Sequence, residues 1–187
     1  YGNDCEDADR HVARVISVFA DLLQSLGKNT RGGAYVMGLY SVTAHEYFGR
    51  ITGALPNGRR KGESFASGIA PENGMDRLGP TAMLNSVHRI ECSRAANGIN
   101  LNAMFDPHSL RGDEGRTALG HLLKVYFGRR GMQIQVNVLD PEVLLAAKQN
   151  PEQYPNLLVR VSGYSAYFGD LTPAMQDEII RRSMLRC

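Results

Sequence analysis

The residue whose type and surroundings most favour chemistry in this sequence is a glycine near its end. Gly163 lies in RVSGYSAYF, residues 160–168, between a strand-like run and an aromatic pair. A turn is one interpretation, because glycine reaches backbone angles that are closed to other residues and often marks the end of a strand. The other interpretation is that the glycine is itself the reactive group. Both stay open on these residues alone.

Two other stretches carry reactive side chains. His45 and Glu46 stand in TAHEYFG, but the metal-binding pattern HExxH is not completed because position 49 is Gly49. This favours a hydrogen-bonded structural histidine over one with a chemical role. Cys92 follows Glu91, yet no neighbouring base or positive charge would make it a thiolate, so an inert thiol is favoured. No phosphate-binding or dinucleotide-binding glycine pattern is present, and nucleotide binding is not supported.

The elements that must position these residues follow from apolar spacing. Residues recurring at three- and four-residue intervals predict helices at 9–26, from Pro80, at 119–127, at 141–149 and from Pro173. Short runs of strand-forming residues predict strands at 34–42, 99–105 and 131–139.

The strand predicted at 131–139 has an amide-rich face, because Gln133, Gln135 and Asn137 alternate with apolar residues. Asp140 and Thr172 are placed to cap the helices that follow them. Strands alternating with helices predict an α/β fold with parallel strands, as an open sheet or as part of a barrel.

Bulk composition narrows the class of protein. The 187 residues allow one sizeable domain, and a net charge of +2 gives no electrostatic case for binding nucleic acid or an anionic membrane. No apolar run approaches the length of a membrane helix, and the acidic start does not resemble a signal peptide. The three cysteines, Cys5, Cys92 and Cys187, are widely spaced. This spacing argues against a disulfide scaffold and against a zinc site, and it favours a reducing cytoplasm.

RVSGYSAYF resembles the C-terminal signature of the glycyl radical enzymes, the pyruvate formate-lyase superfamily. Further blocks resemble the C-terminal region of that family in the same order, so the resemblance covers effectively the whole chain. They are YGND from Tyr1, TGALPNGRRKGESFASG at 52–68, GMDRLGPTAMLNSV at 74–87 and the block at 135–164.

The resemblance implies a fold. It predicts the C-terminal part of a ten-stranded α/β barrel made of two five-stranded halves. Residues 1–140 would supply late barrel strands and helices. Residues 141–187 would form the glycyl radical domain, with the loop at 160–168 and a terminal helix at 173–185.

The resemblance also implies that Gly163 stores a backbone radical. An activating enzyme carrying an iron-sulfur cluster and S-adenosylmethionine would remove a hydrogen from its Cα, so this chain itself would bind no cofactor and no metal. The resulting planar radical is delocalised between the amide nitrogen and the carbonyl, and a side chain would twist that plane. The residues expected to fix the loop and present it to the activating enzyme are Arg160, Val161, Ser162, Tyr164 and Phe168.

In the family the radical passes to a cysteine on a separate upstream loop, which abstracts hydrogen from a small organic substrate. This sequence lacks that loop, and Cys92 does not lie in a matching context. Because the sequence opens at Tyr1 rather than Met, it is expected to be the C-terminal part of a longer enzyme. A stand-alone radical-carrying repair subunit and a non-catalytic module are the alternatives. The expected partners are the rest of the polypeptide, or a chain carrying the cysteine, in a homodimer or hetero-oligomer.

The branch of the family is indicated by SGYSAYF and MQDEIIRRS, which resemble the dehydratases, decarboxylases and C–X lyases more than pyruvate formate-lyase proper. The X-succinate synthases, which add hydrocarbons to fumarate, remain an alternative. Tyr40 and Ser41 match a late barrel strand that lines the substrate cavity in relatives, and Arg182 matches an arginine near the active site of some dehydratases. Structural packing or an ion pair is the alternative role for each.

Overall fold

The computed structural model describes residues 1–182 and 184–186, and its centre is a three-stranded parallel sheet. Strand β1 (Asn102–Phe105) lies between β2 (Gln135–Val138) and β5 (Met184–Leu185). Asn102 stands opposite Gln135 in the register of β1 and β2. The predicted α/β fold with parallel strands is therefore confirmed.

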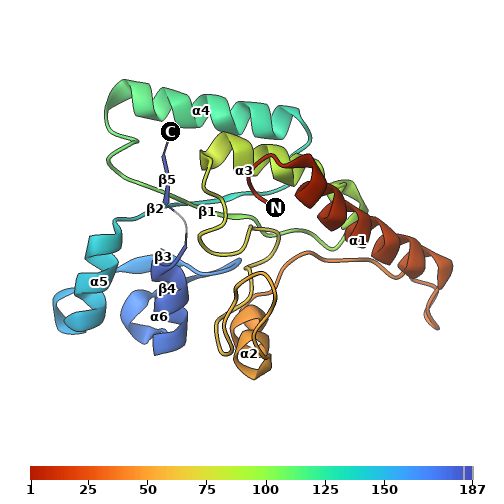
Figure 1. The fold of residues 1–187 in the computed structure, drawn as a ribbon, viewed down its shortest axis with the longest axis horizontal. Helices are drawn as coiled ribbons and strands as arrows, with labels where there is room; N and C mark the ends of the chain where they lie inside the picture. Colours follow the sequence, from red (N-terminus) through yellow and green to blue (C-terminus); the bar gives the residue numbers. More distant parts are fainter. Residues whose placement is uncertain (183, 187) are drawn as a thin grey trace.

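Helices cover both faces of this sheet (Figure 1). On one side lie α3 (Gly79–His88) and α4 (Gly112–Gly128), with α1 (Glu6–Ser25) beside them. On the other side lie α5 (Pro141–Gln149), α6 (Pro173–Ile180) and an antiparallel hairpin of β3 (Leu158–Arg160) and β4 (Ser165–Tyr167). Helix α2 (Ala44–Ile51) contacts α6. Short 3-10 turns complete the order at Cys92–Arg94, Pro151–Gln153 and Phe168–Asp170.

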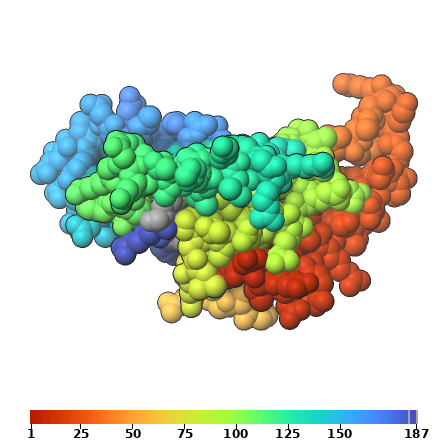
Figure 2. Space-filling view, turned by 90° about the horizontal axis from the view of Figure 1, so that it is seen from above, coloured from red at the N-terminus to blue at the C-terminus, as the bar shows by residue number. Residues whose placement is uncertain are grey.

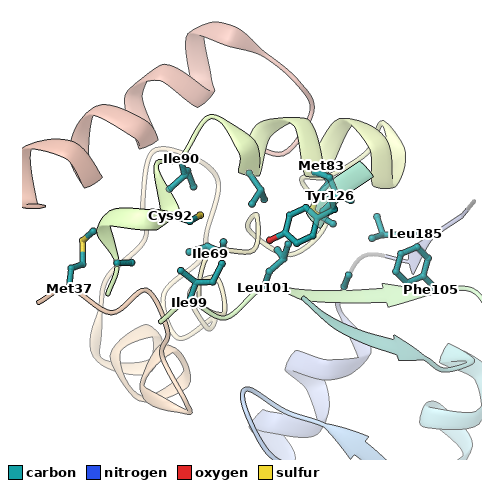
Figure 3. Packing of buried hydrophobic residues seen from close by; sticks show 14 of the residues in the cluster. Met37, Ile69, Met83, Ile90, Cys92, Ile99, Leu101, Phe105, Tyr126 and Leu185 are labelled. Carbon is teal, nitrogen blue, oxygen red and sulfur yellow. The ribbon is translucent and has the colours of Figure 1, made fainter. Parts of the chain in front are cut away.

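The alternation of side chains along β1 divides the core in two. Leu101, Ala103 and Phe105 enter a cluster with α3 and with Tyr126 of α4. Figure 3 labels Leu101, Phe105 and Tyr126 in this cluster. Met104 points to the other face and packs with residues of α5, α6 and the hairpin. All four residues of β1 are buried, and β1 lies within the strand predicted at 99–105.

Local signals also set the helix ends. The Asp140 Oδ1 accepts a hydrogen bond from the Glu142 backbone N–H at 2.9 Å, and the Thr172 Oγ1 accepts one from the Met175 N–H at 3.3 Å. Both predicted caps are confirmed. Helix α1 ends at Ser25, and Gly27 follows it with a φ of +69°, a left-handed conformation that suits glycine.

Two predicted elements are wrong in part. The stretch 34–42 forms no strand, because only Leu39 bridges to Ile99 and Ala34 to Lys28, so no ladder propagates along it. The terminal helix predicted at 173–185 ends at Ile180, because Met184 and Leu185 pair with the central strand β1 instead. Ser183 and Cys187 lie outside the described residues. The structure shows a three-stranded parallel sheet and not the ten-stranded barrel.

Figure 2 shows α4 lying across one face, with the N-terminal region at one end and the C-terminal region at the other. Large apolar side chains are exposed on α1, including Val15, Phe19 and Leu22. None of the helices in the described part of the chain combines the length and apolar character needed to cross a membrane.

Candidate functional site: the loop around Gly163

Gly163 lies in the turn of the β3–β4 hairpin. Arg160 pairs with Ser165 at the end of the ladder, and the Val161 N–H donates to the Tyr164 carbonyl at 2.9 Å. Val161 and Ser162 are buried, whereas Gly163 and Tyr164 are exposed. The hairpin therefore presents the glycine backbone at the surface of the described chain.

Backbone conformation rather than space accounts for glycine at this position. The φ of Gly163 is +87°, in the region that residues with a Cβ rarely adopt. A Cβ added there would have its closest non-neighbouring contact at the Asn100 Nδ2, 3.8 Å away, which is ordinary van der Waals contact. Any substitution would thus strain the turn even though the side chain would fit.

Four buried amide side chains hold the loop from the side of the sheet. They come from β1, β2 and the residue Asn100 ahead of β1, and each contacts a different loop residue. From β2, the Asn137 Oδ1 accepts from the Arg160 N–H at 3.2 Å and the Gln135 Oε1 accepts from the Gly163 N–H at 3.3 Å. From β1, the Asn102 Nδ2 donates to the Val161 carbonyl at 3.1 Å. Ahead of β1, the Asn100 Nδ2 donates to the Ser162 Oγ at 3.2 Å. The amide-rich face predicted for this strand is therefore the surface on which the loop rests.

Arg182, which follows helix α6, also holds the loop. Its Nη1 donates to the Arg160 carbonyl at 2.9 Å and its Nη2 to the Val161 carbonyl at 2.8 Å. The guanidinium also pairs with the Glu178 carboxylate, through the Nε at 3.2 Å and the Nη2 at 2.9 Å. The ion pair anticipated as the alternative role of Arg182 is thus present, and its contact with a substrate stays a prediction.

Glu178 is a fully buried carboxylate beneath this arginine. Burial alone would raise the pKa of the Glu178 carboxyl, but the neighbouring His45 ring and Arg182 guanidinium outweigh it and lower the pKa below its ordinary value. Arg182 is the closer partner, since the His45 Nε2 lies 3.9 Å from the Glu178 Oε1. A carboxylate kept ionised here keeps the arginine in place under the loop.

His45 is buried and serves as a packed, hydrogen-bonded residue. Its Nδ1 lies 2.9 Å from the Ser41 Oγ, which also accepts from the Gly68 N–H at 3.2 Å. The structural interpretation of this histidine therefore fits its surroundings. Ser41 and Tyr40 line a cavity of about 360 Å³ between α1 and residues 68–70. The Tyr40 hydroxyl accepts from the Asn97 Nδ2 at 2.7 Å, and a substrate role for either residue stays a prediction.

The remaining loop residues divide between anchoring and exposure. Phe168 is buried among residues of α5 and α6, and its N–H donates to the Leu157 carbonyl at 2.8 Å. The Arg160 side chain reaches the Ser165 Oγ at 3.1 Å, and Tyr164 is 37% exposed. Phe168 thus ties the hairpin to the helices, while recognition by an activating enzyme stays a prediction for these residues.

Cys92 lies in the first apolar cluster, as Figure 3 shows. Burial raises the pKa of its thiol, which favours the unreactive protonated form and agrees with the inert interpretation. Across residues 1–182 and 184–186, no group of three or more His, Cys, Asp or Glu side chains is placed to hold a metal ion.

Glu178 and the individual amides were not singled out from the sequence as site residues. The available signal was the alternation in GMQIQVNVL, which marks one polar face on an otherwise buried strand. Two unexplained buried amides on one face indicate a polar partner, since most buried side-chain polar groups make at least one hydrogen bond. Glu178 carried no comparable signal, because it stands in an ordinary amphipathic helix.

The sequence pattern of the family described as glycine radical matches residues 65–169, which include β1, β2 and the whole hairpin. The chain belongs to the glycine radical family. Its resemblance to glycyl radical enzymes, stated above on motifs, is thereby confirmed.

The relatives of this glycyl radical chain include dehydratases and lyases. It is 39% identical to trans-4-hydroxy-L-proline dehydratase of Clostridioides difficile over 98% of its own length, and 38% identical to isethionate sulfite-lyase of Bilophila wadsworthia over 98%. The glycerol-bound B12-independent glycerol dehydratase of Clostridium butyricum superposes with a TM-score of 0.95 at 40% identity, covering 100% of this chain and 24% of that one. The chain spans 23% and 22% of the two curated relatives.

Proposed function

We propose that this chain is the C-terminal, radical-carrying part of a glycyl radical enzyme, and that Gly163 stores the radical. The observation that carries the proposal is the left-handed backbone of Gly163 at an exposed turn, inside the matched residues 65–169. A radical at its Cα needs a planar centre without a side chain, and the buried amides and Arg182 hold the flanking peptides in place. In the described chain by itself, the exposed turn leaves the Cα open to an activating enzyme.

The proposed chemistry begins with homolysis of a Gly163 Cα–H bond. The hydrogen atom goes to the radical that the activating enzyme generates from S-adenosylmethionine. The Gly163 radical then takes the thiol hydrogen of a cysteine on the remainder of the enzyme, which restores glycine and leaves a thiyl radical. That thiyl abstracts hydrogen from the substrate. This chain would supply the position of the radical and would bind no cofactor of its own.

The proposed substrate is a small organic molecule that undergoes dehydration, decarboxylation or cleavage of another C–X bond. Support comes from the dehydratase and lyase names of the relatives. No contact described for this chain favours the alternative addition of a hydrocarbon to fumarate.

The proposed setting is the cytoplasm, in a homodimer or hetero-oligomer with the part of the enzyme that holds the cysteine. Similarity over 98% of this chain to relatives about four times as long supports a part of a larger enzyme over a repair subunit or a non-catalytic module. Cys5 and Cys92 are free thiols, which suits a reducing compartment.

Electron paramagnetic resonance tests the radical. The chain is incubated without oxygen with the activating enzyme of a glycyl radical dehydratase and S-adenosylmethionine. We expect a carbon-centred doublet that collapses to a singlet when the glycine is labelled with deuterium at Cα. The Gly163→Ala variant should give no doublet.

Gly169→Ala is the matched control, because Gly169 lies in the same segment without a positive φ and with open space around its Cα. It should keep the doublet. A doublet that persists in Gly163→Ala would place the radical elsewhere. No signal from the unmodified chain, with the activating enzyme shown competent on a relative, would leave Gly163 as a turn residue in a non-catalytic module.

A further inference from the structure

The side chain of Gln135 contacts the backbone amide of the proposed radical residue. Gln135 lies in β2 and is 6% exposed. Its Oε1 accepts from the Arg160 Nε at 2.7 Å and from the Gly163 N–H at 3.3 Å. Two donors from the two ends of the turn therefore converge on one oxygen atom.

The contact with Arg160 fixes the orientation of the Gln135 side-chain amide. A guanidinium has only donors, so the atom at 2.7 Å from the Arg160 Nε must be the glutamine oxygen and not its nitrogen. That bond is short and charge-assisted, and it sets the position of the side chain. The longer bond to Gly163 follows from it. The orientation of Gln135 toward the glycine N–H is thus fixed by a stronger neighbouring contact.

The rest of the Gln135 side chain does not account for its burial. Its Nε2 is buried and has no hydrogen-bond partner among the described residues. A buried donor without a partner costs free energy, so the hydrogen bonds of this side chain are those of its oxygen. The burial of Gln135 therefore places its Oε1 beside Arg160 and Gly163.

The strand gives this oxygen a rigid support. The Gln135 N–H donates to the Leu101 carbonyl at 2.8 Å within the central sheet, and Gln135 stands opposite Asn102 in the ladder. Asn102 in turn donates to the Val161 carbonyl. The sheet therefore holds both sides of the peptide segment that leads into Gly163.

A hydrogen bond at this amide has a chemical consequence. When an unpaired electron forms at a glycine Cα, the amide nitrogen donates electron density toward it, so the N–H becomes more positive and binds an acceptor more strongly. We propose that Gln135 is a positioning residue for Gly163: its oxygen fixes the plane of the peptide between Ser162 and Gly163 and stabilises the radical form more than the glycine. This inference rests on the proposed radical role of Gly163.

The contact is tested first without the radical. In protein labelled with ¹⁵N-glycine, the Gly163 amide signal is assigned by its loss in Gly163→Ala. We expect Gln135→Leu, which removes the acceptor, to move the Gly163 amide proton upfield and to speed its exchange with solvent about fivefold, the effect of losing one ordinary hydrogen bond. Gln135→Glu keeps an oxygen beside Arg160 and adds negative charge, so it should move the same proton downfield.

Gln133→Leu is the matched control. The Gln133 Oε1 also accepts a backbone N–H, that of Leu101 at 2.9 Å, but it does not contact the loop. Its Gly163 signal should stay at the position found in the unmodified chain. An unmoved Gly163 signal in both Gln135 variants would overturn the contact. Should Gln135→Leu fail to fold by circular dichroism, a downfield shift in Gln135→Glu beside an unmoved signal in Gln133→Leu still decides the contact.

The radical is then measured by electron paramagnetic resonance after activation. Gln135→Leu should give about one-fifth of the radical per chain, and Gln135→Glu should recover most of it. Equal yields and equal doublets in all variants would overturn the stabilising role while leaving the proposed function intact. If the unmodified chain gives no radical, the proposed function fails and the stabilising role fails with it, whereas the amide signals still decide the contact.

Discussion

The loop around Gly163 and helix α1 differ in which kinds of side chain are buried and which are exposed. Beneath the loop, polar groups such as Gln135 and Arg182 are buried. Along α1, large apolar groups are exposed, and Phe19 is 49% exposed. Burying a polar group costs free energy unless it is paired, whereas exposing an apolar one forgoes stabilisation. Buried polar groups therefore hold the loop in place at a cost in stability. Helix α1 carries more apolar surface than the core covers.

Helix α1 has apolar residues that pack against the core and others that remain exposed. Its partly buried Val12, Ile16 and Leu23 pack against the first apolar cluster. Val15 and Leu22 belong to the same predicted apolar face but remain exposed. The stripe is therefore wider than the surface that covers it, which is typical of a contact surface.

The largest expected effect comes from breaking the buried ion pair under the loop. Arg182→Met leaves the Glu178 carboxylate without its arginine partner and the Arg160 carbonyl without the Arg182 donor, and the Val161 carbonyl keeps only the bond from Asn102. Removal of one member of a buried pair typically costs about 3–5 kcal/mol of unfolding free energy. We expect a loss of that order in chemical denaturation followed by circular dichroism.

Arg181→Met is the matched control for this experiment. Arg181 is the preceding residue, but its side chain is 47% exposed and its carboxylate neighbour Glu63 lies 3.8 Å away. A surface substitution of this kind should change the unfolding free energy by no more than about 0.5 kcal/mol. Equal losses in the two variants would show that Arg182 does not hold the loop in the way its contacts indicate.

A smaller effect is expected from pH. The folded-state pKa of Glu178 is lowered, so its ionisation contributes stability at pH above the ordinary glutamate value of about 4.5, and this contribution is lost as the pH falls through the folded-state pKa. Glu178→Gln should be less stable than the unmodified chain at pH 7, and the gap should narrow below about pH 4.5. Denaturation curves between pH 3 and pH 7 measure it.

The carboxylates Asp4 and Asp106 also have lowered pKa values, Asp4 through hydrogen bonds from Arg89 and Asn85 and Asp106 through those from His108. Both carboxylates are present in the unmodified chain and in Glu178→Gln, so their contributions cancel in the difference between the two unfolding free energies. A gap that widens toward low pH would contradict the ion-pair account of Glu178.

The smallest effect on stability is expected on α1. Phe19→Ser removes an exposed apolar side chain, so we expect the unfolding free energy to change by no more than about 0.5 kcal/mol. Binding of a dye that recognises apolar surface should fall at the same time. Phe105→Ala, in the core, should instead cost about 3–5 kcal/mol. A large loss in Phe19→Ser would mean that the exposed stripe contributes to this fold and would remove the contrast with the loop.

Much of the fold was predictable because its signals are local. The caps at Asp140 and Thr172 and the amide alternation around Gln135 depend on neighbours a few residues away, and each was confirmed. The strand predicted at 34–42 was wrong because β propensity describes how well a residue fits a paired surface, and most of this segment has no paired neighbour in the described structure. The terminal helix was too long because pairing of Met184 with β1 outweighs helix propensity.

The sequence by itself determined that this chain belongs with the glycyl radical enzymes and that Gly163 is the residue to examine, because an ordered motif and the need for a bare Cα are both written in consecutive residues. Only the tertiary structure decided what holds that glycine. Gln135, Asn102 and Arg182 lie 28, 61 and 19 positions from it along the chain, and a parallel sheet brings them together. Hydrogen bonds between such distant residues depend on register and packing, and no local pattern encodes them.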